Sequence, residues 1–77
     1  MLIIFSRHAI LKMGQRRIPR AAAIEAVKFP DFRMPGRNLR EELYKRFGVN
    51  YLKVVIKPYS SKIVVITAHL VAKVKKN

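Results

Sequence analysis

The side chains in this sequence that could do chemistry are mainly cations. The chain has 77 residues, of which 17 are Lys or Arg, 4 are Asp or Glu and 2 are His, so its net charge is +13. Such an excess destabilises a small fold through self-repulsion and indicates a polyanionic partner. Lys and Arg neutralise phosphates, and an aromatic ring among them can stack on an unpaired base. The composition therefore favours a nucleic-acid partner.

Metal and thiol chemistry find little support in the composition. The chain has no Cys, which excludes disulfides and thiolate metal sites and indicates a reducing, cytoplasmic location. The two histidines, His8 and His69, have no nearby Cys or paired carboxylates to complete a metal site. No apolar run approaches the ~20 residues of a membrane span. We therefore expect no metal, no cofactor and no membrane partner.

The elements that must position these side chains begin with a strand and two helices. The apolar segment Leu2–Phe5 reads as a strand, and Ser6 is a good N-cap for a helix that continues to about Arg17. Pro19 suits the first turn of a second helix over Arg20–Lys28. Pro and Gly residues then mark a loop over 31–38.

The second half of the chain reads as three strands. Segments rich in β-branched and aromatic residues, over Leu39–Phe47, Tyr51–Lys57 and Lys62–Leu70, are separated by short turn sequences. They predict an antiparallel meander that the helices cover on one face. The predicted fold is α+β with the order β-α-α-β-β-β, in a single domain over 1–72 followed by a basic tail over 73–77.

Strand periodicity assigns side chains to the two faces of this sheet. The residues expected to face the helices are Leu39, Leu43, Phe47, Leu52, Val54, Ile56, Val64, Ile66, Ala68 and Leu70. The residues expected on the other side, which we call the open face, include Glu42, Tyr44, Arg46, Lys53, Lys57, Thr67 and His69. Several cations with a Tyr and a His form a plausible platform for single-stranded nucleic acid. The alternative is that these lysines are ordinary solvent-facing residues.

A second basic group lies on the first helix. His8, Lys12 and Arg16 are spaced by four residues and so form one polar stripe. Such a stripe either binds a ligand or is the solvated side of the helix, and the spacing does not choose between the two.

The sequence resembles an uncharacterised prokaryotic family of small domains, a domain of unknown function. Its members begin with an aromatic residue, a Ser or Thr and a His-Ala pair, and close their second helix with Pro-Asp. The segments that carry the resemblance are Phe5–Ala9, Lys12-Met13, Arg16, Ile18, Ile24–Val27, Pro30-Asp31, Tyr44–Phe47, Leu52–Ile56 and Ile63–Ala68. The family is in turn similar to toxins of the RelE, ParE and BrnT kind.

That resemblance implies a RelE-like fold and a toxin that cleaves messenger RNA, on the ribosome or free, without a metal ion. In such enzymes the RNA 2′-hydroxyl attacks the adjacent phosphate, which requires a base, an acid and cations. An acidic antitoxin protein is the implied partner, and the resemblance leaves the oligomeric state open. A non-catalytic RNA- or DNA-binding module and an inhibitor of a protein target are the alternatives.

The resemblance also implies roles for individual residues. His8 or His69 would transfer protons, Arg46 and Lys53 would stabilise the charge of the phosphate and of the transition state, and Tyr44 would stack or assist. The residues expected to bind nucleic acid are Lys12, Arg16, Lys53, Lys57 and Thr67. The chain departs from the family pattern at Arg17, where Gly is frequent, and at His69, where an aromatic residue is common.

Overall fold

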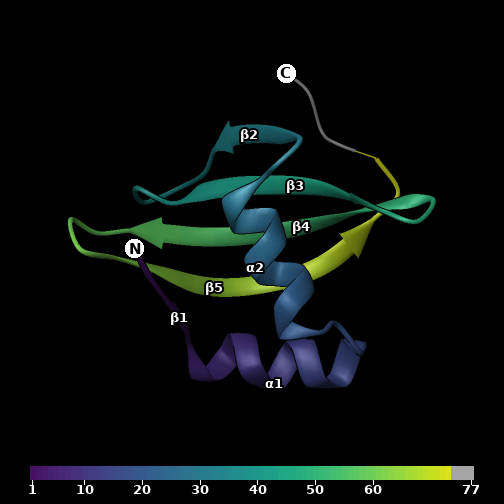
Figure 1. Cartoon of the computed structure of the whole chain (residues 1–77), viewed down its shortest axis with the longest axis horizontal. Coiled ribbons are helices and arrows are strands. Elements are labelled where there is room, and N and C mark those ends of the chain that lie inside the picture. The colour runs from purple at the N-terminus through teal and green to yellow at the C-terminus, as the bar shows by residue number, and fades with distance from the viewer. Residues whose placement is uncertain (74–77) are drawn as a thin grey trace.

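The computed structural model describes residues 1–73, which form five strands and two helices (Figure 1). In chain order these are β1 (Leu2–Phe5), α1 (Arg7–Arg16), α2 (Arg20–Lys28), β2 (Phe32–Pro35), β3 (Glu41–Phe47), β4 (Asn50–Pro58) and β5 (Lys62–Val71). Of the predicted basic tail over 73–77, all but Lys73 lies outside the described residues. Neither helix has the length and apolar character needed to cross a bilayer.

The strands form one mixed sheet in the order β1-β5-β4-β3-β2. β1 pairs with β5 in parallel, and the other neighbours are antiparallel. In Figure 1, α2 crosses the front of the sheet and α1 runs beside β5. The predicted α+β fold with helices on one face is confirmed, although the parallel β1 makes the sheet mixed rather than antiparallel.

The core lies between the helices and the front of the sheet. α1 contributes Ala9 and Met13, and α2 contributes mainly small residues that allow close approach to the strands. The buried residues of this core cluster are Ala9, Met13, Ile18, Ala23, Ala26, Val27, Leu43, Leu52, Val54, Ile56, Val65 and Ala68. The predicted inward set of the middle strand, Leu52, Val54 and Ile56, is therefore confirmed.

The segment predicted as a loop over 31–38 contains the edge strand β2. Phe32 and its successors pair with β3, and Pro35 is tolerated because an edge strand has a side that needs no backbone donor. The turn that follows includes Leu39, which has a φ of 63° and is 85% exposed. The prediction that Leu39 starts a strand and faces the core is wrong, since β3 begins at Glu41.

A β-bulge in β5 changes which residues face the core. Consecutive residues of β4 pair with Thr67 and then with Val65, so Ile66 is an extra residue without a β4 partner. Before the bulge Val65 is buried and Val64 lies on the opposite side, so the prediction that Val64 faces the core is wrong. After the bulge Ala68 faces the core as predicted.

The start of α1 is attached to this bulge by Ser6. The Ser6 hydroxyl accepts a hydrogen bond from the Ala9 amide at 3.0 Å, which caps the helix as predicted. The same hydroxyl donates to the Ile66 carbonyl oxygen at 3.2 Å. The Ser6 side chain thus fixes the start of α1 relative to the bulge, where the alternation of side chains along β5 shifts by one residue.

The end of α1 places Arg17 in the left-handed conformation, with a φ of 56°. The Ile18 amide donates to the Met13 carbonyl at 2.9 Å, as in a helix end that normally contains Gly. Because this conformation costs a side chain about 1 kcal/mol, Arg17→Gly should raise the free energy of unfolding by about that amount in urea denaturation. Arg17→Ala removes the same charge but keeps the strain, so equal stabilisation by both variants would contradict this origin.

Candidate functional site

A row of three polar side chains crosses the open face at one height. Tyr44 on β3 is paired with Lys53 on β4, and Lys53 is paired with His69 on β5. Directly opposed residues in antiparallel strands have Cβ atoms about 4.5–5.5 Å apart on the same face. The open-face positions predicted for Tyr44, Lys53 and His69 are therefore confirmed, and we call these three residues the central row.

Glu42 links two members of the central row. The Tyr44 hydroxyl donates to Glu42 Oε1 at 3.0 Å, and Lys53 Nζ lies 3.7 Å from the same oxygen. Lys53 Nζ is also 5.9 Å from the centroid of the Tyr44 ring. Lys53 therefore has one fixed acidic neighbour and its ammonium lies over an aromatic face.

Tyr44 is held as a neutral phenol. Burial, followed by the hydrogen bond to Glu42 and the charge of that carboxylate, raises the pKa of Tyr44 to about 12. The residue is only 2% exposed. Its ring therefore offers no free face for the predicted stacking on a base, and at neutral pH its hydroxyl can donate a proton in a hydrogen bond but is not a base.

The pKa of His69 is shifted in the opposite direction to that of Tyr44. Burial lowers its pKa below the ordinary value, and the nearby charges of Lys53 and Arg16 lower it further, while the Glu42 carboxylate opposes this effect. The imidazole is therefore neutral at physiological pH. A half-buried neutral imidazole beside two cations is able to accept a proton while the cations attract an anion.

Arg16 brings the end of the α1 stripe onto this site. Its Nη1 donates to the Ala68 carbonyl oxygen at 2.9 Å and to Thr67 Oγ1 at 3.4 Å. Lys12 is half-buried and His8 is exposed on the same stripe. His8 lies eight residues from Arg16, or about 12 Å along the helix axis, so the structure brings His69 and not His8 into the central row.

Arg46 lies toward the β3–β4 hairpin, two residues from the central row and thus about 7 Å along the strand. It is exposed, and its Nε donates to the Gly48 carbonyl at 2.8 Å. Its guanidinium lies 5.6 Å from the centroid of the Tyr51 ring, which meets the Phe32 ring edge-on at 5.7 Å. Sequence reasoning missed Phe32 because its segment was predicted to be a loop.

A second aromatic and cationic group lies at the β4–β5 hairpin. The Tyr59 ring has Lys57 Nζ at 5.6 Å and Lys62 Nζ at 5.3 Å from its centroid, and Tyr59 is 46% exposed. Tyr59 and Lys62 were not predicted as site residues because Tyr59 lies in a turn and Lys62 begins a strand. The signal that could have identified them is the alternation along β4. It places Lys57 on the open face, and two residues further along the chain it reaches Tyr59, in the turn that leads to Lys62.

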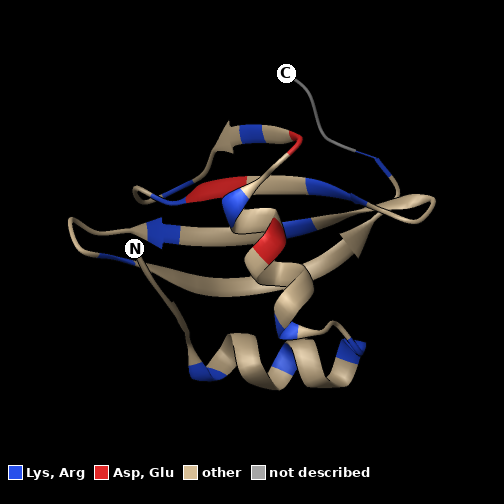
Figure 2. Ribbon diagram, viewed as in Figure 1, with Lys and Arg blue, Asp and Glu red and all other residues tan. Residues whose placement is uncertain are grey.

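Acidic side chains are largely absent from the open face. Asp31 and Glu41 form ion pairs with Lys45 and Arg33, and Glu42 is the acidic residue that the strand registers place among the open-face cations. Figure 2 shows basic residues on both helices and along the sheet, with few acidic positions between them. The open face is thus strongly positive.

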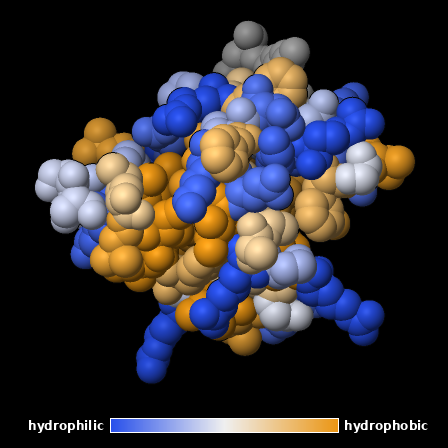
Figure 3. All heavy atoms as spheres, viewed as in Figure 1, coloured by the Kyte–Doolittle hydropathy of each residue, from blue (hydrophilic) through white to orange (hydrophobic). Residues whose placement is uncertain are grey.

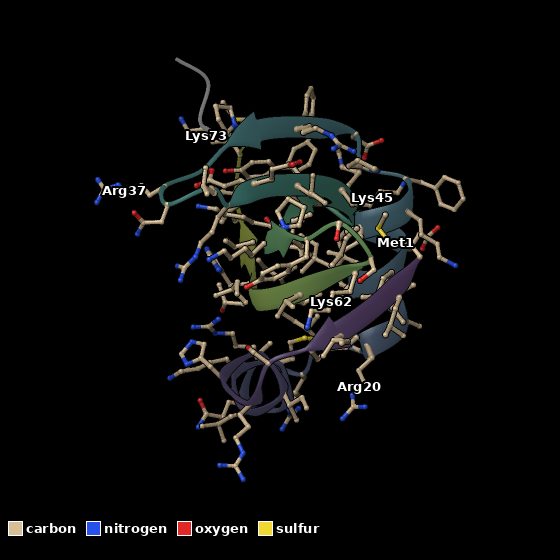
Figure 4. The ribbon with its side chains drawn as sticks, turned by 90° about the vertical axis from the view of Figure 1, so that its left-hand side faces the viewer. Met1, Arg20, Arg37, Lys45, Lys62 and Lys73 are labelled. Carbon is tan, nitrogen blue, oxygen red and sulfur yellow. The ribbon has the colours of Figure 1, made fainter. Side chains whose placement is uncertain are left out.

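The two faces of the sheet differ in character. In Figure 4, α2 lies to the right, and nitrogen-tipped side chains, Arg37 among them, extend from the other side. The α2 face in Figure 3 instead shows an apolar area on the side where β1 lies. Within residues 1–73, no three His, Asp or Glu side chains gather in a way that could hold a metal ion.

Comparison with known proteins gives one match. The family model described as "Domain of unknown function (DUF4258)" matches residues 5–69. The matched segment begins at Phe5 and ends at His69, and therefore includes the whole central row. No curated protein and no solved structure matches the chain.

Proposed function

Since the chain belongs to the family Domain of unknown function (DUF4258), which by its description has no assigned activity, we propose a function from the site itself. The open face binds RNA, and the central row cleaves it without a metal ion. The observation that supports this proposal best is the position of His69, which is the cross-strand partner of Lys53 and follows Ala68, whose carbonyl oxygen accepts a hydrogen bond from Arg16.

The reaction follows from the protonation states of these groups. His69 accepts the proton of a ribose 2′-hydroxyl, whose oxygen forms a bond to the adjacent phosphorus as the bond to the 5′-oxygen breaks. Lys53 and Arg16 stabilise the charge that develops on the phosphoryl oxygens. The leaving 5′-oxygen takes a proton from the Lys53 ammonium. The products are a 2′,3′-cyclic phosphate and a 5′-hydroxyl.

The direct test is incubation of the purified protein with RNA, with and without ribosomes. We expect cleavage that yields these two ends, persists in EDTA and leaves DNA intact, because DNA lacks the attacking hydroxyl. Intact RNA under both conditions, together with salt-sensitive RNA binding, would instead indicate a non-catalytic RNA-binding module.

We further propose that the domain acts in the cytoplasm as the toxin of a toxin–antitoxin module. This proposal extends the interpretation of the sequence as similar to RelE, ParE and BrnT toxins, and it is supported by the net charge of +13, which suits an acidic antitoxin. Expression in a bacterial host should arrest growth, and His69→Ala should relieve the arrest. Arrest that persists in this variant would favour inhibition of a protein target.

A further inference from the structure

The open face has an aromatic and cationic group at each end of β4, on opposite sides of the central row. The β3–β4 and β4–β5 hairpins lie at opposite ends of the sheet (Figure 1). Arg46 on Tyr51 lies at the first hairpin, and Tyr59 with Lys57 and Lys62 lies at the second. From Tyr51 to Tyr59 the chain spans about 25 Å at the rise of a strand.

We infer that the open face along β4 is a track for single-stranded RNA, with a base-stacking position at each end and the reacting phosphate at the central row. This inference rests on the proposed function and defines its substrate as an unpaired strand several nucleotides long. A strand bound in this way contacts the protein on both sides of the cleaved bond.

Tyr59 forms the stacking position at the β4–β5 end. Nearly half of its surface is accessible, in contrast to the buried Tyr44, so a base can reach the ring. The ammonium groups of Lys57 and Lys62 lie 5.6 Å and 5.3 Å from the centroid of this ring and are placed to bind the phosphates that flank a stacked base. Tyr44 is buried and Tyr51 is half-buried beside the Arg46 guanidinium, so Tyr59 is the most exposed of the three tyrosines and the best placed for stacking.

Arg46 forms the position at the β3–β4 end. The Gly48 carbonyl and the Tyr51 ring both hold its guanidinium, yet the residue is exposed. A guanidinium plane that is already oriented can stack on a base at a small entropic cost. Between the two ends the open-face positions of β4 are Lys53, Val55 and Lys57, which combine two cations with an apolar surface.

The pattern fits an unpaired strand better than a duplex or an acidic protein. Stacking requires a base whose face is free, and the faces of duplex bases are covered by their neighbours. The carboxylates of an acidic chain would use the cations but offer no aromatic face to stack on Tyr59 and Arg46. The two ends thus distinguish RNA from other polyanions.

The test measures binding of fluorescent 2′-O-methyl oligouridine, which lacks the attacking hydroxyl and so cannot be cleaved. For an oligonucleotide of about 12 residues, we expect Tyr59→Ala to weaken binding by about 5- to 100-fold. Tyr59→Phe keeps the ring and should bind as the unmodified protein does. An oligonucleotide of about 4 residues should bind weakly and respond little to Tyr59→Ala, because it cannot reach from the central row to Tyr59.

Three results would overturn the track. The first is equal affinity of Tyr59→Ala and Tyr59→Phe for the oligonucleotide of about 12 residues. The second is an affinity of the unmodified protein for a duplex of the same length that equals its affinity for the single strand. The third is an affinity for poly-glutamate that equals the affinity for the single strand and that Tyr59→Ala leaves unchanged. Because the oligonucleotide is not cleavable, each result is independent of catalysis. Absence of cleavage with a clear Tyr59 effect would overturn the proposed catalytic function and leave the track in place.

Discussion

Replacement of His69 by Ala should abolish RNA cleavage while RNA binding persists. A positioned general base contributes about 10²- to 10⁴-fold to the rate, and His69 is the imidazole in the central row. Because Lys53 and Arg16 remain in the variant, its affinity for uncleavable RNA should change by less than about 3-fold. Single-turnover cleavage with labelled RNA measures the rate, and fluorescence anisotropy measures the binding.

The pH dependence distinguishes His69 from a residue with only a structural role. Burial, Lys53 and Arg16 lower the pKa of His69 and Glu42 opposes them, so the base is already free at neutral pH. The rate should rise with pH only below the ordinary histidine value of about 6.5 and be level above it. His8→Ala is the matched control and should keep full activity, whereas a loss equal to that of His69→Ala would move the catalytic centre to α1.

Replacement of Lys53 by Met should lower the cleavage rate by about 10²- to 10³-fold, the usual effect of removing a group that stabilises the transition state. Met keeps most of the side-chain length beside Tyr44 while it removes the ammonium. RNA binding should also weaken, and the slope of log Kd against log salt concentration should decrease by about the amount expected for one lost phosphate contact. Thermal unfolding measured in parallel checks that the variant is folded.

Lys53→Arg tests whether Lys53 provides more than charge. The guanidinium restores the positive charge, so the salt dependence of binding should return, but it does not release a proton at neutral pH. Cleavage should therefore remain at least about 10-fold slow, in line with general-acid effects. In Lys53→Met, loss of the ammonium should raise the pKa of His69 and move the pH profile upward. An unmoved profile would show that the two residues do not interact.

Much of the fold could be predicted from local sequence signals. The bounds of β1 and α2 follow from an apolar segment, a proline and a clear helical face, and the structure confirms both. β2 could not be predicted, because Pro35 and Gly36 are turn signals and the pairing with β3 that stabilises this strand is a tertiary interaction. The wrong assignment of Val64 has a similar cause, since a bulge in a strand that is apolar on both sides leaves no trace in its alternation.

From the sequence, the candidate site could be predicted only as a set of residues on one face of the sheet. Period-two alternation placed Lys53 and His69 together correctly, because their strands are neighbours and the alternation of β4 is clear. The sequence could not show that Tyr44 is buried or that Arg16 reaches across to Ala68. These facts depend on side-chain packing between distant segments, which composition and spacing do not determine.

The bulge at Ile66 has an evolutionary consequence for relatives of this chain. The first half of β5 pairs with β1, whereas the second half bears Thr67 and His69, and the two halves are out of phase by one residue. Loss of this single residue in a lineage would leave both faces as they are, because Val65, Thr67, Ala68 and His69 would then alternate as in a regular strand. An alignment of relatives should therefore treat the two halves as separate blocks, and a one-residue gap between them would mark members that lack the bulge but still present a residue at the His69 position on the open face.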